Sequence, residues 1–209
     1  MSDALSYSAS IDVNMYSNAG DVKPLQTYKG AVKKNKDNYY SSMLGKTIVI
    51  NSNYGLMVDE KQKVIVIDAI KEKNKAQQEA LKRESLLMID TALTKNYRLK
   101  YLVNDTKTKI IELLFPEGSP YKKMEIEIDL TTYFIKKAVY YIEKDKNQDY
   151  SFEKISVAYS HVVLNAAPAA DVFSEKKYVQ IKGKDIKAAS AYLAYKIIDQ
   201  RKNKILLAK

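Results

Sequence analysis

Few residues in this sequence could carry catalysis or hold a metal ion. His161 is the only histidine. It stands on an alternating segment with Tyr159 and Val163, where a histidine is more often packed or exposed than catalytic. The absence of cysteine excludes thiolate nucleophiles, disulfides and cysteine-based metal sites, and a single histidine excludes histidine clusters. We therefore expect a protein that is not an enzyme and that needs no cofactor.

Two short motifs imitate ligand-binding loops but lack the residues that such loops need. Residues 145–149 (DKNQD) resemble the start of a calcium loop, yet the sixth position is Tyr150 instead of glycine and the twelfth is Ser156 instead of glutamate. Residues 45–47 (GKT) resemble the end of a phosphate loop, but its first glycine would fall at Tyr40. We interpret the first as a polar hairpin tip and the second as a chance match.

The abundance of tyrosine and lysine leaves several functions open. The chain has 17 tyrosines, no tryptophan and a net charge of +10. Tyrosine suits sheet faces and the rims of amphiphile pockets, and beside lysine it could also stack on single-stranded nucleic acid. The basic charge is nearly all lysine, with only Arg83, Arg98 and Arg201 to offer the forked contact that base-specific readers favour. Packing within a sheet, contact with a guest molecule and nucleic-acid binding therefore all remain as alternatives.

Alternating hydrophobicity is the main structural signal. In residues 122–142 (KKMEIEIDLTTYFIKKAVYYI), apolar Met124, Ile126 and Ile128 alternate with glutamates, which indicates a strand with one buried face. Asp129 and the two following threonines predict a turn, and a second β-rich run returns. We expect further strands at residues 5–15, 27–34, 38–44, 46–50, 54–58, 64–68, 97–103, 109–115, 152–163 and 178–182.

Two segments predict helices instead. Residues 70–93 contain neither glycine nor proline and are rich in helix-forming residues. Residues 185–201 are rich in alanine and place Ile186, Ala189, Leu193 and Ile197 on one helical face. No apolar run approaches the roughly 20 residues that span a bilayer. The fold class predicted is mainly β (α+β), in one domain.

The N-terminal residues bear on the compartment. The first ten residues have no basic or apolar leader and enter an alternating strand almost at once. This pattern is typical of a mature exported protein whose signal peptide was removed and replaced by an initiator methionine. A cytosolic protein could look the same.

In the order of its elements the chain resembles the lipoprotein-carrier superfamily of LolA and LolB. The resemblance covers residues 5–173 and rests on the segments SYSASIDVNMY, TYKGAVKKNKDNYYSSM, NYGLMVDEKQKVIVID, YRLKYLVNDTKTKIIELLF, MEIEIDLTTYFIKKAVYYI and DVF. It implies a single, strongly curved antiparallel half-barrel of about eleven strands, with helices against the concave face and a C-terminal helix. We place this domain at residues 1–183 and a helical extension at residues 184–209. The family's arginine-proline-aromatic element is missing at residues 33–40, which puts the shuttling of triacylated lipoproteins in doubt.

The alternation, with the apolar stripe of the first helix, defines the residues that would line a cavity for an acyl chain. These are Tyr7, Ile11, Val13, Met15, Met43, Ile48, Leu56, Leu87, Met88, Leu99, Tyr101, Ile111, Leu113, Met124, Ile126, Ile128, Val139 and Tyr141. The alternative is that these residues pack wholly on the helices and leave no cavity.

The resulting expectation is a monomeric, periplasmic carrier or binding protein for a lipid or an acylated protein, linked to transport and outer-membrane biogenesis. We also expect envelope proteins as partners and a peripheral contact with the membrane. We do not expect the protein to bind a specific nucleic acid. One alternative is an envelope or secretion-machinery accessory protein that uses the same scaffold to dock proteins. The other is a cytosolic binder of single-stranded nucleic acid.

Overall fold

The computed structural model describes residues 6–70, 98–143 and 152–201. The chain divides into two compact units. Unit 1 contains residues 9–30 and 98–163 of the described chain, and unit 2 contains residues 6–8, 31–70 and 164–201. Among the described residues, no helix is both long enough and apolar enough to cross a membrane.

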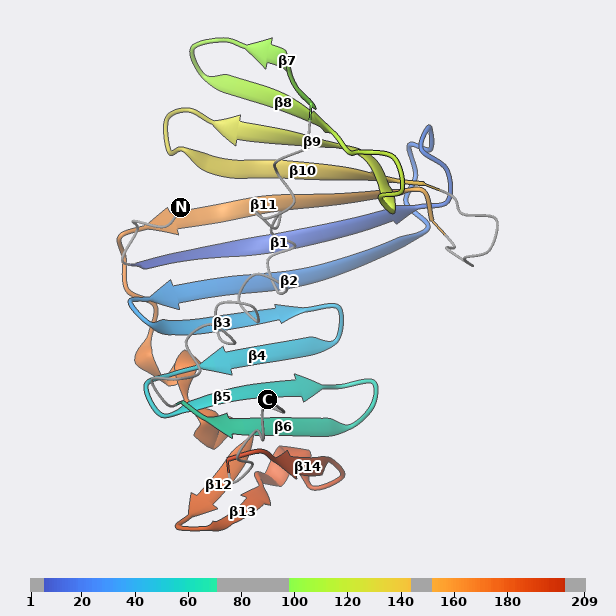
Figure 1. Cartoon of the computed structure of the whole chain (residues 1–209). Helices are drawn as coiled ribbons and strands as arrows, with labels where there is room; N and C mark the ends of the chain where they lie inside the picture. The colour runs from blue at the N-terminus through green and yellow to red at the C-terminus, as the bar shows by residue number, and fades with distance from the viewer. Residues whose placement is uncertain (1–5, 71–97, 144–151, 202–209) are drawn as a thin grey trace, which may run out of the picture. The chain divides into compact units, whose positions relative to one another are not determined.

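The strands form a 12-stranded sheet in the order β14-β6-β5-β4-β3-β2-β1-β11-β10-β9-β8-β7. A separate two-stranded sheet pairs β12 with β13, and Figure 1 labels these elements. The strands of the large sheet are β1 (Ser6–Tyr16), β2 (Gln26–Asn35), β3 (Asn38–Met43), β4 (Lys46–Ile50), β5 (Tyr54–Asp59), β6 (Val64–Ala69), β7 (Arg98–Asn104), β8 (Thr108–Leu114), β9 (Tyr121–Asp129), β10 (Phe134–Ile142), β11 (Lys154–Leu164) and β14 (Lys196–Asp199). The expected number of about eleven strands agrees with β1 to β11, and β14 adds a twelfth.

In unit 1, the antiparallel ladder from β7 to β11 confirms the hairpins that the alternating pattern predicts. The turn at Asp129 forms because its carboxylate accepts hydrogen bonds from the backbone amides of Thr131 at 2.7 Å and Thr132 at 3.3 Å. Tyr133, which closes this turn, has a φ of 53°. These backbone hydrogen bonds hold the pKa of Asp129 below its ordinary value, because they stabilise the charged carboxylate.

In unit 2, β2 to β6 form a meander of short hairpins. Five apolar residues project from one face of this meander: Val49, Leu56, Val58, Ile65 and Ile67. They form a buried cluster with two residues of the C-terminal segment, by which we mean residues 170–201. Those two residues are Tyr178 and Val179, of which Val179 is fully buried. The C-terminal segment therefore packs on this face of β4, β5 and β6.

The helix expected over residues 185–201 is wrong. The structure has β13 (Asp185–Ala188), a short 3₁₀ helix η5 (Ser190–Tyr192) and β14, preceded by β12 (Val179–Lys182). Gly183 adopts a φ of 59° in the two-residue turn between β12 and β13, a conformation that favours glycine. Ile197 pairs in parallel with Ile65 of β6, while Leu193, expected on the buried helical face, is 77% exposed. Packing on the sheet thus overrides the helix-like composition.

The other helical elements of the described residues are the 3₁₀ helices η3 (Ala170–Phe173) and η4 (Glu175–Lys177). The helix expected over residues 70–93 lies outside the described residues from residue 71 onward, and so do the helices expected against a concave face. The domain boundary expected at residue 183 stays a prediction.

Candidate functional site

Seven of the predicted cavity residues do share one face of unit 1. The register places Ile111 opposite Ile126 and Leu113 opposite Met124, and residues that face each other across antiparallel strands project to the same side. On the next strand, Leu99 pairs with Leu113 and Tyr101 pairs with Ile111. We call this set the β7–β9 apolar face: Leu99, Tyr101, Ile111, Leu113, Met124, Ile126 and Ile128.

The β7–β9 apolar face is buried on β9 and exposed on the end strand β7. Met124 is fully buried, and Leu113 and Ile126 are each 8% exposed. Leu99 and Tyr101, on the end strand β7, are 54% and 53% exposed. Figure 1 shows β7 (green) beside β8 at the edge of this ladder. An apolar surface that begins in the core therefore continues to solvent along β7.

A cation stands at one end of this face. Lys109 pairs with Ile128 across β8 and β9, so its side chain projects to the same side. Its ammonium lies 5.1 Å from the centre of the Tyr101 ring, within the range of a cation–π interaction. The face thus offers an apolar stretch with a positively charged group next to it, which is the chemistry of an anionic amphiphile site.

Val139 and Tyr141 are not on this face, so that part of the predicted cavity wall is wrong. They pair with Glu125 and Lys123, which belong to the charged side of β9, and the ammonium of Lys123 lies 4.4 Å from the centre of the Tyr141 ring. The register shifts at Lys136, where a β-bulge inserts one residue and exchanges the two sides of β10 beyond it.

Tyr140 takes the place that the sequence pattern assigned to its neighbours. It pairs with Met124, packs against the buried residues Leu113, Met124 and Ile126, and has its ring centre 5.8 Å from that of Tyr121. Burial raises the pKa of Tyr140, since the charged phenolate is poorly solvated there. The pair of adjacent lysines at 136 and 137 was the one sequence signal for the bulge, because strict alternation would bury one of them.

The predicted residues of β1 are core residues. Tyr7, Ile11 and Val13 are 5%, 1% and 1% exposed, and Met15 is half-buried. Leu87 and Met88 lie outside the described residues.

The predicted residues of unit 2 divide between the two faces of its sheet. Met43 and Ile48 lie on one face, since Ile48 pairs with Ser41 and Ser41 is two residues from Met43. Leu56 pairs with Val49 on the other face, inside the buried cluster under the C-terminal segment. These three residues therefore cannot line one cavity wall.

Asn51 connects the β4–β5 turn of unit 2 to the C-terminal segment. Its side-chain amide donates to the carbonyl oxygen of Phe173 at 3.0 Å and to the carboxylate of Glu175 at 2.7 Å. Its side-chain carbonyl oxygen accepts hydrogen bonds from the backbone amides of Asn53 and Tyr54, both at 2.9 Å. One side chain thus stabilises the turn and holds the start of the C-terminal segment.

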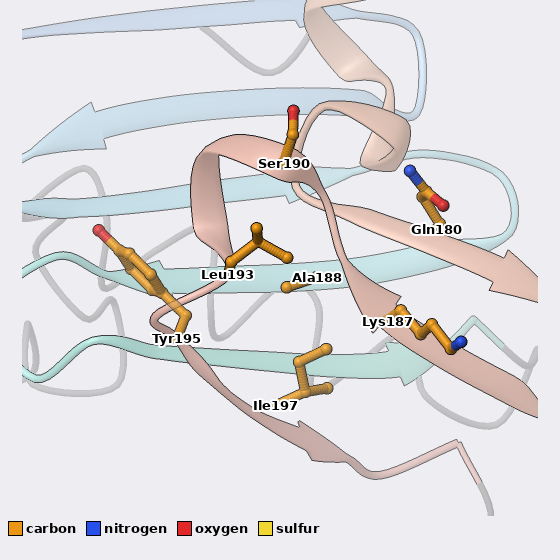
Figure 2. A pocket seen from close by; sticks show the side chains of 7 residues that line it. All are labelled: Gln180, Lys187, Ala188, Ser190, Leu193, Tyr195 and Ile197. Carbon is orange, nitrogen blue, oxygen red and sulfur yellow. The ribbon is translucent and has the colours of Figure 1, made fainter.

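The C-terminal segment also forms an open groove of about 580 Å³ that the sequence pattern does not predict. Helical spacing would have separated its lining residues, whereas the strands bring them together. In Figure 2, Gln180 and Lys187 lie toward one end, and Tyr195 lies toward the other. The lining residues are Gln180, Lys187, Ala188, Ser190, Leu193, Tyr195 and Ile197, and we call this site the C-terminal groove.

An aromatic row supports the Tyr195 end of the C-terminal groove. The ring centres of Tyr178 and Tyr192 are 5.3 Å apart, and those of Tyr192 and Tyr195 are 5.0 Å apart. The ammonium of Lys63 lies 4.9 Å from the centre of the Tyr195 ring and donates to its hydroxyl at 3.2 Å. Burial raises the pKa of Tyr178 and of Tyr192. This end of the groove is therefore preorganised.

The single histidine lies next to the hydroxyl of the residue before it in the chain. His161 is exposed on β11, has a φ of 50°, and its Nδ1 lies 3.2 Å from the hydroxyl of Ser160. Across the described part of the chain, no group of three or more histidine, aspartate or glutamate side chains could hold a metal ion.

Comparisons with known proteins give structural neighbours only. No family model matches the sequence, and no curated protein matches it. A structure of an uncharacterised conserved protein from Thermus thermophilus aligns over 94% of this chain and 91% of its own, at 8% identity and a TM-score of 0.49. A LolA superfamily protein from Nitrosomonas europaea aligns over 83% and 91%, at 13% identity and a TM-score of 0.31. An outer-membrane lipoprotein-sorting protein domain from Vibrio parahaemolyticus aligns over 81% and 89%, at 11% identity and a TM-score of 0.31.

Proposed function

We propose that this protein is a non-enzymatic binding protein for a lipid or a lipidated protein, and that it acts as a carrier in the periplasm. The observation that carries the proposal is the exposure of Leu99 and Tyr101, each more than half exposed, on a sheet face that is continuous with the buried Met124. Large apolar side chains in one continuous row on a sheet are typical of a surface that a ligand covers.

The energetic argument favours an acyl chain as that ligand. Each methylene removed from water contributes about 0.8 kcal/mol, so eight methylenes laid along β7 and β8 would contribute about 6 kcal/mol before the cost of ordering them. Lys109, at the same face, would neutralise an anionic headgroup. The unbranched Met124 at the buried side adapts to chains of different shape.

The test uses two variants of the same strand whose substituted side chains project to opposite sides of the sheet. Leu99 lies on the β7–β9 apolar face, whereas Val103 pairs with Ile110, which pairs with the charged Glu127 on the other side. We expect Leu99→Asp to weaken the binding of a palmitoylated peptide by about tenfold or more, because the carboxylate would be desolvated by the chain. Val103→Asp should change the affinity by less than about twofold. Affinities would be measured by fluorescence titration with a labelled peptide.

Two further measurements complete this test. The same peptide without its acyl group should not bind, and native mass spectrometry of protein isolated from a bacterial envelope should show an added mass that solvent extraction releases as lipid. Equal binding by the Leu99→Asp and Val103→Asp variants would overturn the assignment of the site. Failure of the unmodified protein to bind any acylated probe would overturn the function itself.

A further inference from the structure

The C-terminal groove has a polar, cationic end that the β12–β13 hairpin builds. Gln180 and Lys187 are directly opposed across the two strands, so their side chains project to the same side of the hairpin. Both are exposed. Within the described residues, the ammonium of Lys187 has no ion-pair partner. An ammonium beside a side-chain amide offers several hydrogen-bond donors to one small anion.

The rest of the groove is apolar and held in place by the sheet. Ile197 is positioned by parallel pairing of β14 with β6, where it lies opposite Ile65. Leu193 follows the η5 turn and is 77% exposed, and Figure 2 shows its side chain beside Ala188. An exposed leucine that lines the same groove as Ala188 and Ile197 is a surface that an aliphatic group can cover.

The charge around the groove favours an anion. Asp199 is neutralised by Arg201, whose guanidinium donates to both carboxylate oxygens at 2.8 Å and also to the carbonyl oxygen of Lys184 at 3.1 Å. Asp185 and Glu60, which lies close enough to Tyr178 and Tyr192 to raise their pKa in addition to burial, then remain against four lysines of this segment, so the net local charge is positive. These lysines are Lys182, Lys184, Lys187 and Lys196.

From these observations we infer that the C-terminal groove binds a carboxylate attached to an aliphatic group. The ammonium of Lys187 and the amide of Gln180 hold the carboxylate, and Ala188, Leu193 and Ile197 cover the aliphatic part. One ammonium and one amide match a singly charged carboxylate better than a doubly charged phosphate. Such a group is present both in a free fatty acid and at the C-terminus of a peptide that ends in an aliphatic residue. This site is separate from the β7–β9 apolar face and does not depend on the proposed function.

The test measures binding of two probes by isothermal titration calorimetry. Octanoate represents the fatty acid, and acetyl-Ala-Ala-Leu with a free carboxylate represents the peptide terminus. The C-terminal amide of the same peptide and octanol are the matched uncharged probes, and neither should bind the Leu99→Asp variant, whose β7–β9 apolar face no longer takes an acyl chain. Binding of either charged probe to the Leu99→Asp variant supports the inference and identifies the source of the carboxylate, and failure of both probes to bind overturns the inference.

Three variants locate the site. Lys187→Met should weaken the binding of the charged probe by about tenfold, because a charge-assisted hydrogen bond is lost. Lys184→Met is the matched control, since Lys184 is an exposed lysine of the same hairpin that does not line the groove, and it should leave the affinity unchanged. Leu193→Asp should weaken binding at least as much as Lys187→Met and, being at an exposed position, should leave the circular dichroism spectrum intact. Equal effects of Lys187→Met and Lys184→Met would overturn the inference.

The test of the C-terminal groove can fail or succeed independently of the test of the proposed function. Leu99→Asp should leave octanoate and peptide binding in the groove unchanged, and Lys187→Met should leave the binding of a palmitoylated peptide at the β7–β9 apolar face unchanged. Loss of groove binding in the Leu99→Asp variant would show that the ligand occupies the other site, and would overturn the inference.

Discussion

Two aspartates stabilise turns of unit 1 by the same hydrogen-bond pattern. Asp105 accepts hydrogen bonds from the backbone amides of Thr108 at 2.6 Å and Lys107 at 2.8 Å, as Asp129 does from the amides two and three residues after it. These backbone hydrogen bonds lower the pKa of both carboxyl groups in the folded protein. Because each hydrogen bond needs the charged carboxylate as a strong acceptor, the turns couple folding to pH.

We predict that Asp105 and Asp129 together make the folded protein less stable at acidic pH. A carboxyl group whose pKa is lower in the folded state contributes stability above its unfolded pKa of about 4, and this contribution is lost as the pH falls through the folded pKa. The urea midpoint of unfolding should therefore decrease between about pH 5 and about pH 3. The double variant Asp105→Asn and Asp129→Asn keeps an oxygen acceptor in each turn but does not titrate there, so its midpoint should decrease less. Identical pH profiles for the two proteins would contradict this prediction.

At the scale of elements, the C-terminal segment acts as a cover for part of unit 2. Val179 of β12 is fully buried against Val58, Ile65 and their neighbours, and Asn51 holds the beginning of the segment. Ile181 and Ile186 pair with each other on the same side of the hairpin as Val179 and pack on the same cluster. The hairpin thus contributes one apolar side to the core and turns Gln180 and Lys187 to solvent.

We predict that Val179→Ala lowers the free energy of unfolding by about 1–3 kcal/mol, because it removes buried methyl groups and leaves a cavity. The neighbouring Gln180→Ala changes an exposed side chain of the same strand and should cost less than about 0.5 kcal/mol. Chemical denaturation monitored by circular dichroism would measure both. Equal costs would mean that β12 does not cover the cluster as described.

At the scale of the whole molecule, the strand order determines how the chain can fold. β1 lies beside β11, which follows it by more than a hundred residues, and the amide of Glu153 donates to the carbonyl oxygen of Tyr16 at 2.9 Å. The other antiparallel neighbours are hairpins or near neighbours in the chain. Closing the loop between β1 and β11 therefore costs conformational entropy before the pairing is gained.

We predict slow refolding as the consequence. Proteins dominated by pairings between distant segments refold in milliseconds to seconds, and we expect the main refolding phase of this chain in about that range or slower. Stopped-flow fluorescence of the tyrosines after dilution from urea would measure it. A main phase in microseconds would contradict the strand order described for unit 1.

Local patterns in the sequence determined the existence of most strands and turns. Alternation at Met124, Ile126 and Ile128 places these residues correctly on one face, because an undistorted strand projects every second side chain to the same side. The turn at Asp129 was predictable because an aspartate can bond the amides that follow it in the chain. Both features depend on residues that are close together in sequence.

The tertiary structure alone decided which side of each strand faces the core, and on which strands the C-terminal residues pack. The bulge at Lys136 reverses the sides of β10 beyond it, and pairing with β9 is what reveals this shift. Leu56 and Ile48 are both apolar strand residues, but only the register, which pairs Leu56 with Val49, shows that they lie on opposite faces. The segment over residues 185–201 has helix-like composition and becomes strand because burying Ile197 beside Ile65 outweighs a weak local preference. The C-terminal groove follows from that choice, since its residues, which all lie between residues 180 and 197, are brought together by the β12–β13 hairpin and by the pairing of β14 with the distant β6.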